Sequence, residues 1–198
     1  MPRKPSFERD EVLEQAMDLF WSRGYNRTSM RDLKDATRLN PGSLYAAFEN
    51  KQGVFTESLG LYSRGLRREV ESLLGGNDAP LDRIRRFFDN LVEGSHQDKE
   101  SRGCLLVNTL IEAPADEPEI RAQAGEALQY VERRFETLIA EGQRDGSIQS
   151  QRPAATLART LMTGIFGMRV YSRMPDGLDH IREIVNTLID GTLAPRTN

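Results

Sequence analysis

The fold of this chain is decided by residues 28–51, TSMRDLKDATRLNPGSLYAAFENK, which read as two short helices joined by a tight turn. In the second helix Leu44 and Phe48 stand at i and i+4 and form one apolar face. Tyr45 points elsewhere, and its neighbours are small: Gly42, Ser43, Ala46 and Ala47. A helix with one apolar side and one bare side can lie close against a large partner, and the major groove of DNA, roughly 12 Å wide, admits one helix. The stretch therefore predicts a helix-turn-helix whose reading helix spans residues 40–48.

Helical periodicity continues through the rest of the chain. Val12, Ala16 and Phe20 lie on one stripe that predicts a helix over residues 8–22, with Gly24 as its end. Similar stripes predict further helices over residues 55–73, 84–92, 104–113, 118–144, 153–166 and 176–189. The segment 104–113 is apolar nearly all round, which is typical of a helix buried on every side. No strand pattern or repeat is present, so the prediction is an all-α fold of about nine helices.

Capping residues mark the starts of the two short helices. Thr28 is placed to cap the helix that carries Met30 and Leu33 on its inner face. Asn40 is placed to cap the reading helix, and Pro41 follows at the first helical position, where a missing N–H costs nothing. We expect a core formed by Leu13, Ala16, Phe20, Met30, Leu33, Leu39, Leu44 and Phe48.

Composition limits the class of protein. We expect a DNA-binding headpiece over residues 1–51, with nine basic and eight acidic residues, and a larger body over residues 52–198. Residues 23–51 contain six basic and three acidic residues, but the acidic residues of the first predicted helix offset this excess of positive charge. A basic surface therefore has to come from geometry. A single cysteine excludes an intramolecular disulfide, and neither a signal peptide nor an apolar run near 18 residues is visible. These features predict a cytoplasmic protein that does not enter a membrane.

The order of the headpiece motifs resembles the TetR (tetracycline-repressor, AcrR-like) family of bacterial regulators. The resemblance rests on Gly24-Tyr25, Thr28-Ser29, the run 39–48 and Lys51, and it covers about residues 8–55. It implies a repressor whose body binds a small molecule and dimerises. One position departs from the family, because Arg38 stands where Gly is usual before Leu39. If that position requires a positive φ, Arg adopts it at a cost on the order of 1 kcal/mol.

The predicted DNA-binding residues are Thr28, Ser29, Arg31, Asn40, Pro41, Gly42, Ser43, Tyr45 and Lys51. The resemblance places the hydroxyl residues of this set and Lys51 at phosphate-contacting positions. The bare side of the reading helix offers methyl groups to thymine and no bidentate partner for guanine, so Arg31 is the best candidate for a base contact. Arg3 and Lys4 form a candidate minor-groove arm. Simpler interpretations are a half-buried Tyr45, a Lys51 that only follows a helix end, and a solvated Arg31.

The resemblance assigns the body to ligand binding and dimerisation. The predicted ligand-binding residues are Phe88, Cys104, Asn108, Tyr130 and Phe166, although each apolar one also suits an ordinary core. Cys104 starts the apolar segment after Arg102-Gly103, where a thiolate that senses electrophiles and an inert small side chain are both consistent with the sequence. The last two helices, with Gly164 and Gly167, are the expected surface of a homodimer.

Other functions find little support. His96 and His180 are the two histidines, neither stands in a metal-ligand spacing, and no nucleophile or phosphate-loop motif occurs. We therefore expect no enzyme, no metal and no cofactor, and as partners double-stranded DNA, a small-molecule effector and a second copy of the chain. The alternative is a DNA-binding regulator without an inducer that a protein partner controls.

Overall fold

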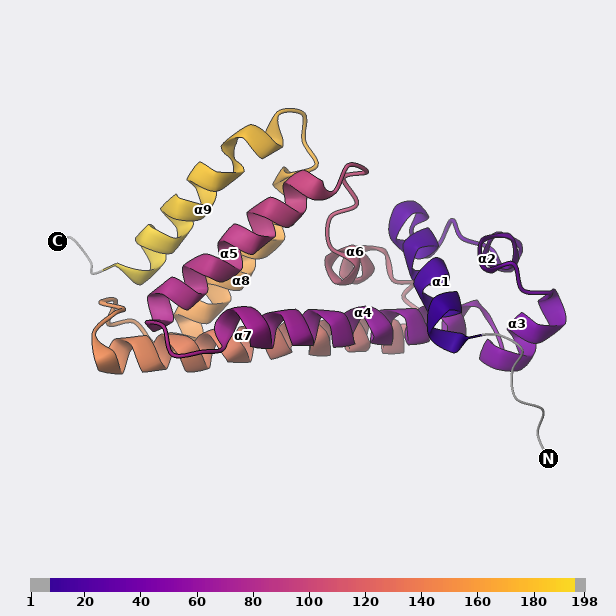
Figure 1. Ribbon diagram of the computed structural model, residues 1–198, viewed down its shortest axis with the longest axis horizontal. Coiled ribbons are helices and arrows are strands. Elements are labelled where there is room, and N and C mark those ends of the chain that lie inside the picture. The colour runs from indigo at the N-terminus through magenta and orange to yellow at the C-terminus, as the bar shows by residue number, and fades with distance from the viewer. Residues whose placement is uncertain (1–7, 195–198) are drawn as a thin grey trace. The chain divides into compact units, whose positions relative to one another are not determined.

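The computed structural model describes residues 8–194, and these form nine α-helices and no strand (Figure 1). In chain order the helices are α1 (Arg9–Arg23), α2 (Met30–Thr37), α3 (Pro41–Phe48), α4 (Lys51–Leu74), α5 (Pro80–Gln97), α6 (Leu105–Glu112), α7 (Pro118–Asp145), α8 (Ala154–Tyr171) and α9 (Gly177–Leu193). The all-α prediction is confirmed. Within residues 8–194, no helix combines the length and apolarity that a membrane span requires. The candidate arm residues Arg3 and Lys4 lie outside the described range.

The described residues divide into two compact units. Residues up to 65 and residues 105–127 form the first, and residues 66–104 with residues from 128 onward form the second. All of α1, α2 and α3 belongs to the first unit, together with the start of α4. The predicted boundary at residue 51 is a division by function and stays a prediction.

The core of the first unit is aromatic at its centre. Phe20 of α1 meets Phe55 of α4 edge to face at 4.8 Å between ring centroids, and Tyr25 lies 4.7 Å from the same Phe55 ring. Of the expected core residues, Leu13, Ala16, Phe20, Leu33, Leu44 and Phe48 are buried. Met30 and Leu39 are half-buried, because they lie beside the ends of α2 and α3, where fewer side chains surround them.

Residues of α6 and the following turn contact the headpiece within the same unit. The Tyr25 hydroxyl donates to Glu117 at 2.5 Å, and the Asn26 side chain donates to the carbonyl of Glu112 at 2.9 Å. The prediction that residues 104–113 are buried on every side is wrong for the second half, since Ile111 is 70% exposed. Leu105, Leu106, Val107 and Thr109 are buried, whereas Ile111 and Glu112 in the last turn of α6 are exposed.

Local signals set most helix ends. Gly24 ends α1 with φ 82, and Asn40 caps α3 by accepting from the backbone N–H of Ser43 at 2.9 Å, both as predicted. The predicted cap of α2 is wrong, because Ser29 and not Thr28 is its N-cap. Asp176, where the last predicted helix begins, is the N-cap residue of α9; it has φ 58, and its side chain makes no capping hydrogen bond.

In the second unit α9 lies against both α5 and α8 (Figure 1). Phe88 is fully buried, and its ring lies within 6.1 Å of the rings of Phe87 and Phe135. Gly164 allows α8 and α9 to approach, since a Cβ built there would lie 2.1 Å from the side chain of Leu188. This glycine therefore serves packing within one chain.

The turn between α2 and α3 contains a left-handed residue. Arg38 has φ 56 and ψ 15, a conformation that glycine adopts without a Cβ penalty. The family resemblance anticipated glycine at this position, and the structure shows the backbone reason.

We expect Arg38→Gly to raise the free energy of unfolding by about 0.5–1 kcal/mol. The substitution relieves the Cβ strain in the folded protein, and the greater conformational entropy of glycine in the unfolded chain offsets part of that gain. Thermal and urea unfolding of the full chain measure the difference. The matched control is Arg31→Gly inside α2, which should lower stability by about 1 kcal/mol. Equal effects of the two substitutions would contradict the strain at Arg38.

Candidate nucleic-acid interface

The rotation of α3 about its own axis is set by two buried side chains. Leu44 and Phe48 are 1% and 3% exposed, whereas Tyr45 is 50% exposed. Pro41, Gly42 and Ala46 are exposed on the same helix, and Ser43 and Ala47 are half-buried. The structure thus presents the bare side of α3 at the surface, as the sequence predicts.

The start of α3 combines a cap with an open backbone. The Asn40 side chain holds the N–H of Ser43, and Pro41 contributes no N–H. Gly42 is exposed at the second helical position, so its backbone N–H can donate to an anion outside the protein.

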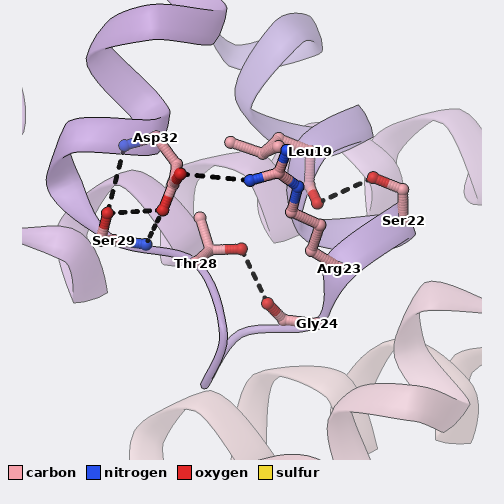
Figure 2. Close-up of polar contacts among 7 residues, drawn as sticks. All are labelled: Leu19, Ser22, Arg23, Gly24, Thr28, Ser29 and Asp32. Carbon is pink, nitrogen blue, oxygen red and sulfur yellow. Dashed lines mark hydrogen bonds and ion pairs between the residues drawn. The ribbon is translucent and has the colours of Figure 1, made fainter.

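A capping box begins α2, and Figure 2 shows it in detail. The Ser29 hydroxyl donates to the Asp32 carboxylate at 2.5 Å and accepts from the Asp32 N–H at 3.2 Å, while the Ser29 N–H also donates to that carboxylate. Arg23 at the end of α1 adds an ion pair to Asp32 at 3.1 Å. The Ser29 hydrogen bonds, with help from Arg23, hold the pKa of Asp32 below its ordinary value. The Ser29 hydroxyl is therefore already engaged, and a phosphate would have to compete for it.

Thr28 lies beneath this surface. It is 2% exposed, and its hydroxyl donates to the carbonyl of Gly24 at 2.8 Å (Figure 2). This bond closes the turn between α1 and α2. The geometry favours a structural role for Thr28 over the predicted phosphate contact.

Lys51 is the first residue of α4, where the helix dipole disfavours a cation. Its ammonium is held by Tyr25, whose carbonyl lies 3.1 Å and whose ring centroid lies 4.2 Å from Nζ. The interpretation that Lys51 only follows a helix end does not explain this placement. An ammonium has three N–H donors, so the contact with the Tyr25 carbonyl leaves two for other acceptors.

Arg31 is exposed at the second position of α2, directly beside the capping box. Its surface position is compatible both with a base contact and with a solvated side chain, so its role stays a prediction.

The five predicted ligand-binding residues do not share one unit. Phe88, Cys104, Tyr130 and Phe166 belong to the second unit, and Asn108 belongs to the first. Cys104 is buried directly before α6. The Tyr130 hydroxyl donates to Glu71, which raises the pKa of that phenol, and the Arg67 guanidinium lies 4.6 Å from the centroid of its ring.

Two polar features were missed by the sequence interpretation. The spacing of Ser29 and Asp32 matches a capping box and could have been recognised. Arg9 binds the carbonyl of Ala47 and the carboxylate of Glu57, and no local signal announces contacts across 38 and 48 positions.

Comparison with known families agrees with this geometry. Residues 12–57 match the model described as bacterial regulatory proteins, tetR family. Residues 80–188, more than half of the chain, match the tetracyclin repressor-like C-terminal domain.

Individual relatives cover nearly the whole chain. The transcriptional repressor ComR of Escherichia coli (strain K12) is 27% identical over 188 residues, which are 94% of this chain and 90% of ComR. The repressor DhaR of Mycobacterium sp. (strain GP1) is 22% identical, over 96% of this chain and 94% of DhaR. The solved structure of a CifR cysteine mutant with 26-bp double-strand operator DNA has a TM-score of 0.83 and 29% identity, and covers 96% of this chain and 98% of CifR.

We expect Ser29→Ala to lower the free energy of unfolding by about 1 kcal/mol, because α2 loses its N-cap. The same change removes the largest cause of the lowered pKa of Asp32, so that pKa should rise towards its ordinary value. Carboxyl NMR titration of Asp32 in both proteins measures the rise.

The pH dependence of stability has a defined sign. Because the folded pKa of Asp32 is lowered, its stabilisation is present above pH of about 4 and is lost as the pH falls through the folded pKa. The stability difference between the wild type and Ser29→Ala should therefore shrink in acid. A difference that grows below that pH would contradict the capping-box assignment.

Proposed function

This chain belongs to the TetR family of bacterial regulatory proteins, and we propose that it is a cytoplasmic transcriptional repressor that binds a palindromic operator as a homodimer and leaves it when a small apolar or electrophilic molecule binds. The proposed reading element is α3, inserted into the major groove of duplex DNA.

One observation carries the proposal. A single helix buries Leu44 and Phe48 in the headpiece and exposes Tyr45 together with small residues. Small side chains let a helix backbone come close to the floor of a groove, and an exposed tyrosine supplies a hydroxyl and a ring at its edge. The operator DNA in the CifR structure supports the same partner for this chain.

The proposed phosphate contacts come from groups that remain available at the surface. These are the Gly42 N–H, the Ser43 and Tyr45 hydroxyls and the ammonium of Lys51. Such contacts position the protein without reading sequence, and methyl groups of α3 would meet thymine methyls. Arg31 is proposed as the residue that reads a base edge.

The proposed dimer forms through α8 and α9. Val170 and Met174 are 53% and 55% exposed near the end of α8, and Ile184 is 37% exposed on α9. A groove beside Ile184 is lined by Tyr171, His180, Glu183, Thr187 and Leu188. Two such faces related by a two-fold axis would bury these apolar groups, and Gly167, whose Cβ position is open, would permit close crossing.

The effector is proposed to bind in the second unit, where Cys104, Tyr130 and Phe166 are candidate contacts. An electrophile would add to the sulfur of Cys104, whereas an apolar molecule would need only the surrounding side chains. The sequence of α4 runs from the headpiece into the second unit, so a shift of this helix is the proposed signal. The ligand can release DNA only if its affinity differs between the two states.

The test begins with selection of bound duplexes from a random pool by the wild-type protein, which should return a palindrome. On the selected duplex, Tyr45→Ala and Lys51→Ala should weaken binding to all sequences, because phosphate contacts are lost. Lys51→Ala should also flatten the dependence of log K on log salt by about 0.9. Arg31→Ala should instead reduce discrimination between sequences by about 1–3 kcal/mol. Gel shifts over a salt series measure these effects.

A matched control is Arg144→Ala, which removes an exposed arginine in the last turn of α7, a helix that belongs to neither the proposed reading element nor the proposed dimer surface. Its affinity should equal that of the wild type. Unchanged binding by all three headpiece variants, with circular dichroism showing folded protein, would refute the proposed interface.

We expect Ile184→Glu to shift the protein from dimer to monomer, because it places two charges in the apolar interface. Analytical ultracentrifugation measures the shift, and operator affinity should fall with it. Ile111→Glu makes the same change at an exposed isoleucine of the first unit and should leave the dimer intact. A dimer that survives Ile184→Glu would place the interface elsewhere.

A further inference from the structure

The junction between α3 and α4 is short and strained. Only Glu49 and Asn50 separate the two helices. Glu49 has φ 65 and ψ −53, and the Asn50 N–H donates to the carbonyl of Phe48 at 2.7 Å. This is a γ-turn with a positive φ at its centre, a rare conformation that persists only where surrounding contacts hold it.

Close packing surrounds the same turn. A Cβ built on Gly53 would lie 2.0 Å from the carbonyl oxygen of Phe48, so the first turn of α4 passes directly beside the end of α3. Even a small change in the angle between α3 and α4 would therefore alter the contact between Gly53 and the carbonyl of Phe48.

One guanidinium, from the first residue of α1, holds this joint. Arg9 donates through Nη2 to the carbonyl of Ala47 at 3.1 Å, in the last turn of α3. Its Nε and Nη2 donate to the two carboxylate oxygens of Glu57 in α4, at 3.0 and 2.5 Å. Its Cζ lies 4.4 Å from the centroid of the Phe48 ring.

The contacts of Arg9 require an arginine. A lysine ammonium is a point charge, whereas the guanidinium fork binds both oxygens of Glu57 and still presents an N–H to Ala47. The positive charge also lies at the C-terminal end of α3, where the helix dipole favours a cation.

The ion pair of Arg9 and Glu57 is too exposed to contribute much to the free energy of unfolding. Their side chains are 42% and 39% exposed, and ion pairs of that kind contribute little to the free energy of unfolding. The three contacts of Arg9 instead restrict the direction of α3, because they join its last turn to α1 and α4.

We infer that Arg9 is a positioning residue for DNA reading, which sets the angle of α3 against α4 so that its exposed side meets the base edges in register. The inference rests on the proposed function of α3 as the reading helix. Arg9 acts through the backbone of α3 and makes no base contact itself. Discrimination between sequences depends on the placement of α3 within fractions of an ångström, so loosening its end reduces discrimination more than overall affinity.

The test compares wild type, Arg9→Lys, Arg9→Ala and Glu57→Gln in the full chain. The probes are the duplex selected by the wild type and a scrambled duplex of equal composition. We expect Arg9→Lys to keep the melting temperature within a few degrees while the ratio of the two affinities falls roughly tenfold, the size of one lost base contact. Arg9→Ala should do the same, Glu57→Gln should do so to a lesser extent, and Arg144→Ala is the control that should change nothing.

A second readout needs no DNA. Amide hydrogen exchange of residues 44–48 should speed up in Arg9→Lys, while exchange in the core of α1 around Phe20 should stay unchanged. An unchanged affinity ratio and unchanged exchange would overturn the inference. An equal loss of affinity for both duplexes would also overturn it, because it would make Arg9 a phosphate contact. A wild type that does not distinguish the duplexes would refute the proposed function, and the exchange data would still decide whether Arg9 holds α3.

Discussion

The burial of Leu44 and Phe48 is the constraint on which the rest of the candidate interface depends. An eight-residue helix makes few contacts of its own, so two side chains buried on one side decide where every other residue faces. With these two in the core, Tyr45 and the small residues of α3 reach the surface together. The same burial places Phe48 beneath the guanidinium of Arg9, so packing and the polar joint act on one end of α3.

Some charged residues of the headpiece are already engaged by neighbouring side chains or backbone groups. Asp32 holds Ser29 and Arg23, and Tyr25 holds Lys51. A net charge of −3 for the whole chain therefore says little about DNA binding, since the available groups are backbone N–H groups, hydroxyls and individual cations placed by geometry. An incoming phosphate would have to add to these contacts or replace them, which links affinity to the stability of the helix ends.

Much of the fold could be predicted because its signals are local. Apolar spacing located all nine helices described in residues 8–194, and Gly24, Asn40 and Pro41 marked helix ends correctly. The errors came where neighbouring residues compete for one role. Thr28 and Ser29 both suit an N-cap. The spacing of Ser29 and Asp32 already favours Ser29, and the structure shows that Ser29 caps α2 while the Thr28 hydroxyl donates to the carbonyl of Gly24. The apolar pattern of residues 104–113 likewise gave no sign that Ile111 lies at the surface.

The sequence alone determined the helices, the turn between α2 and α3, and which side of α3 is apolar, since these depend on interactions between residues a few positions apart. Tertiary structure decided which polar groups are engaged. Tyr25 and Glu117 are 92 positions apart, and Arg9 and Glu57 are 48 apart. Whether such residues meet depends on how the helices pack, because periodicity assigns a side chain to a face but does not name the partner that the face will contact.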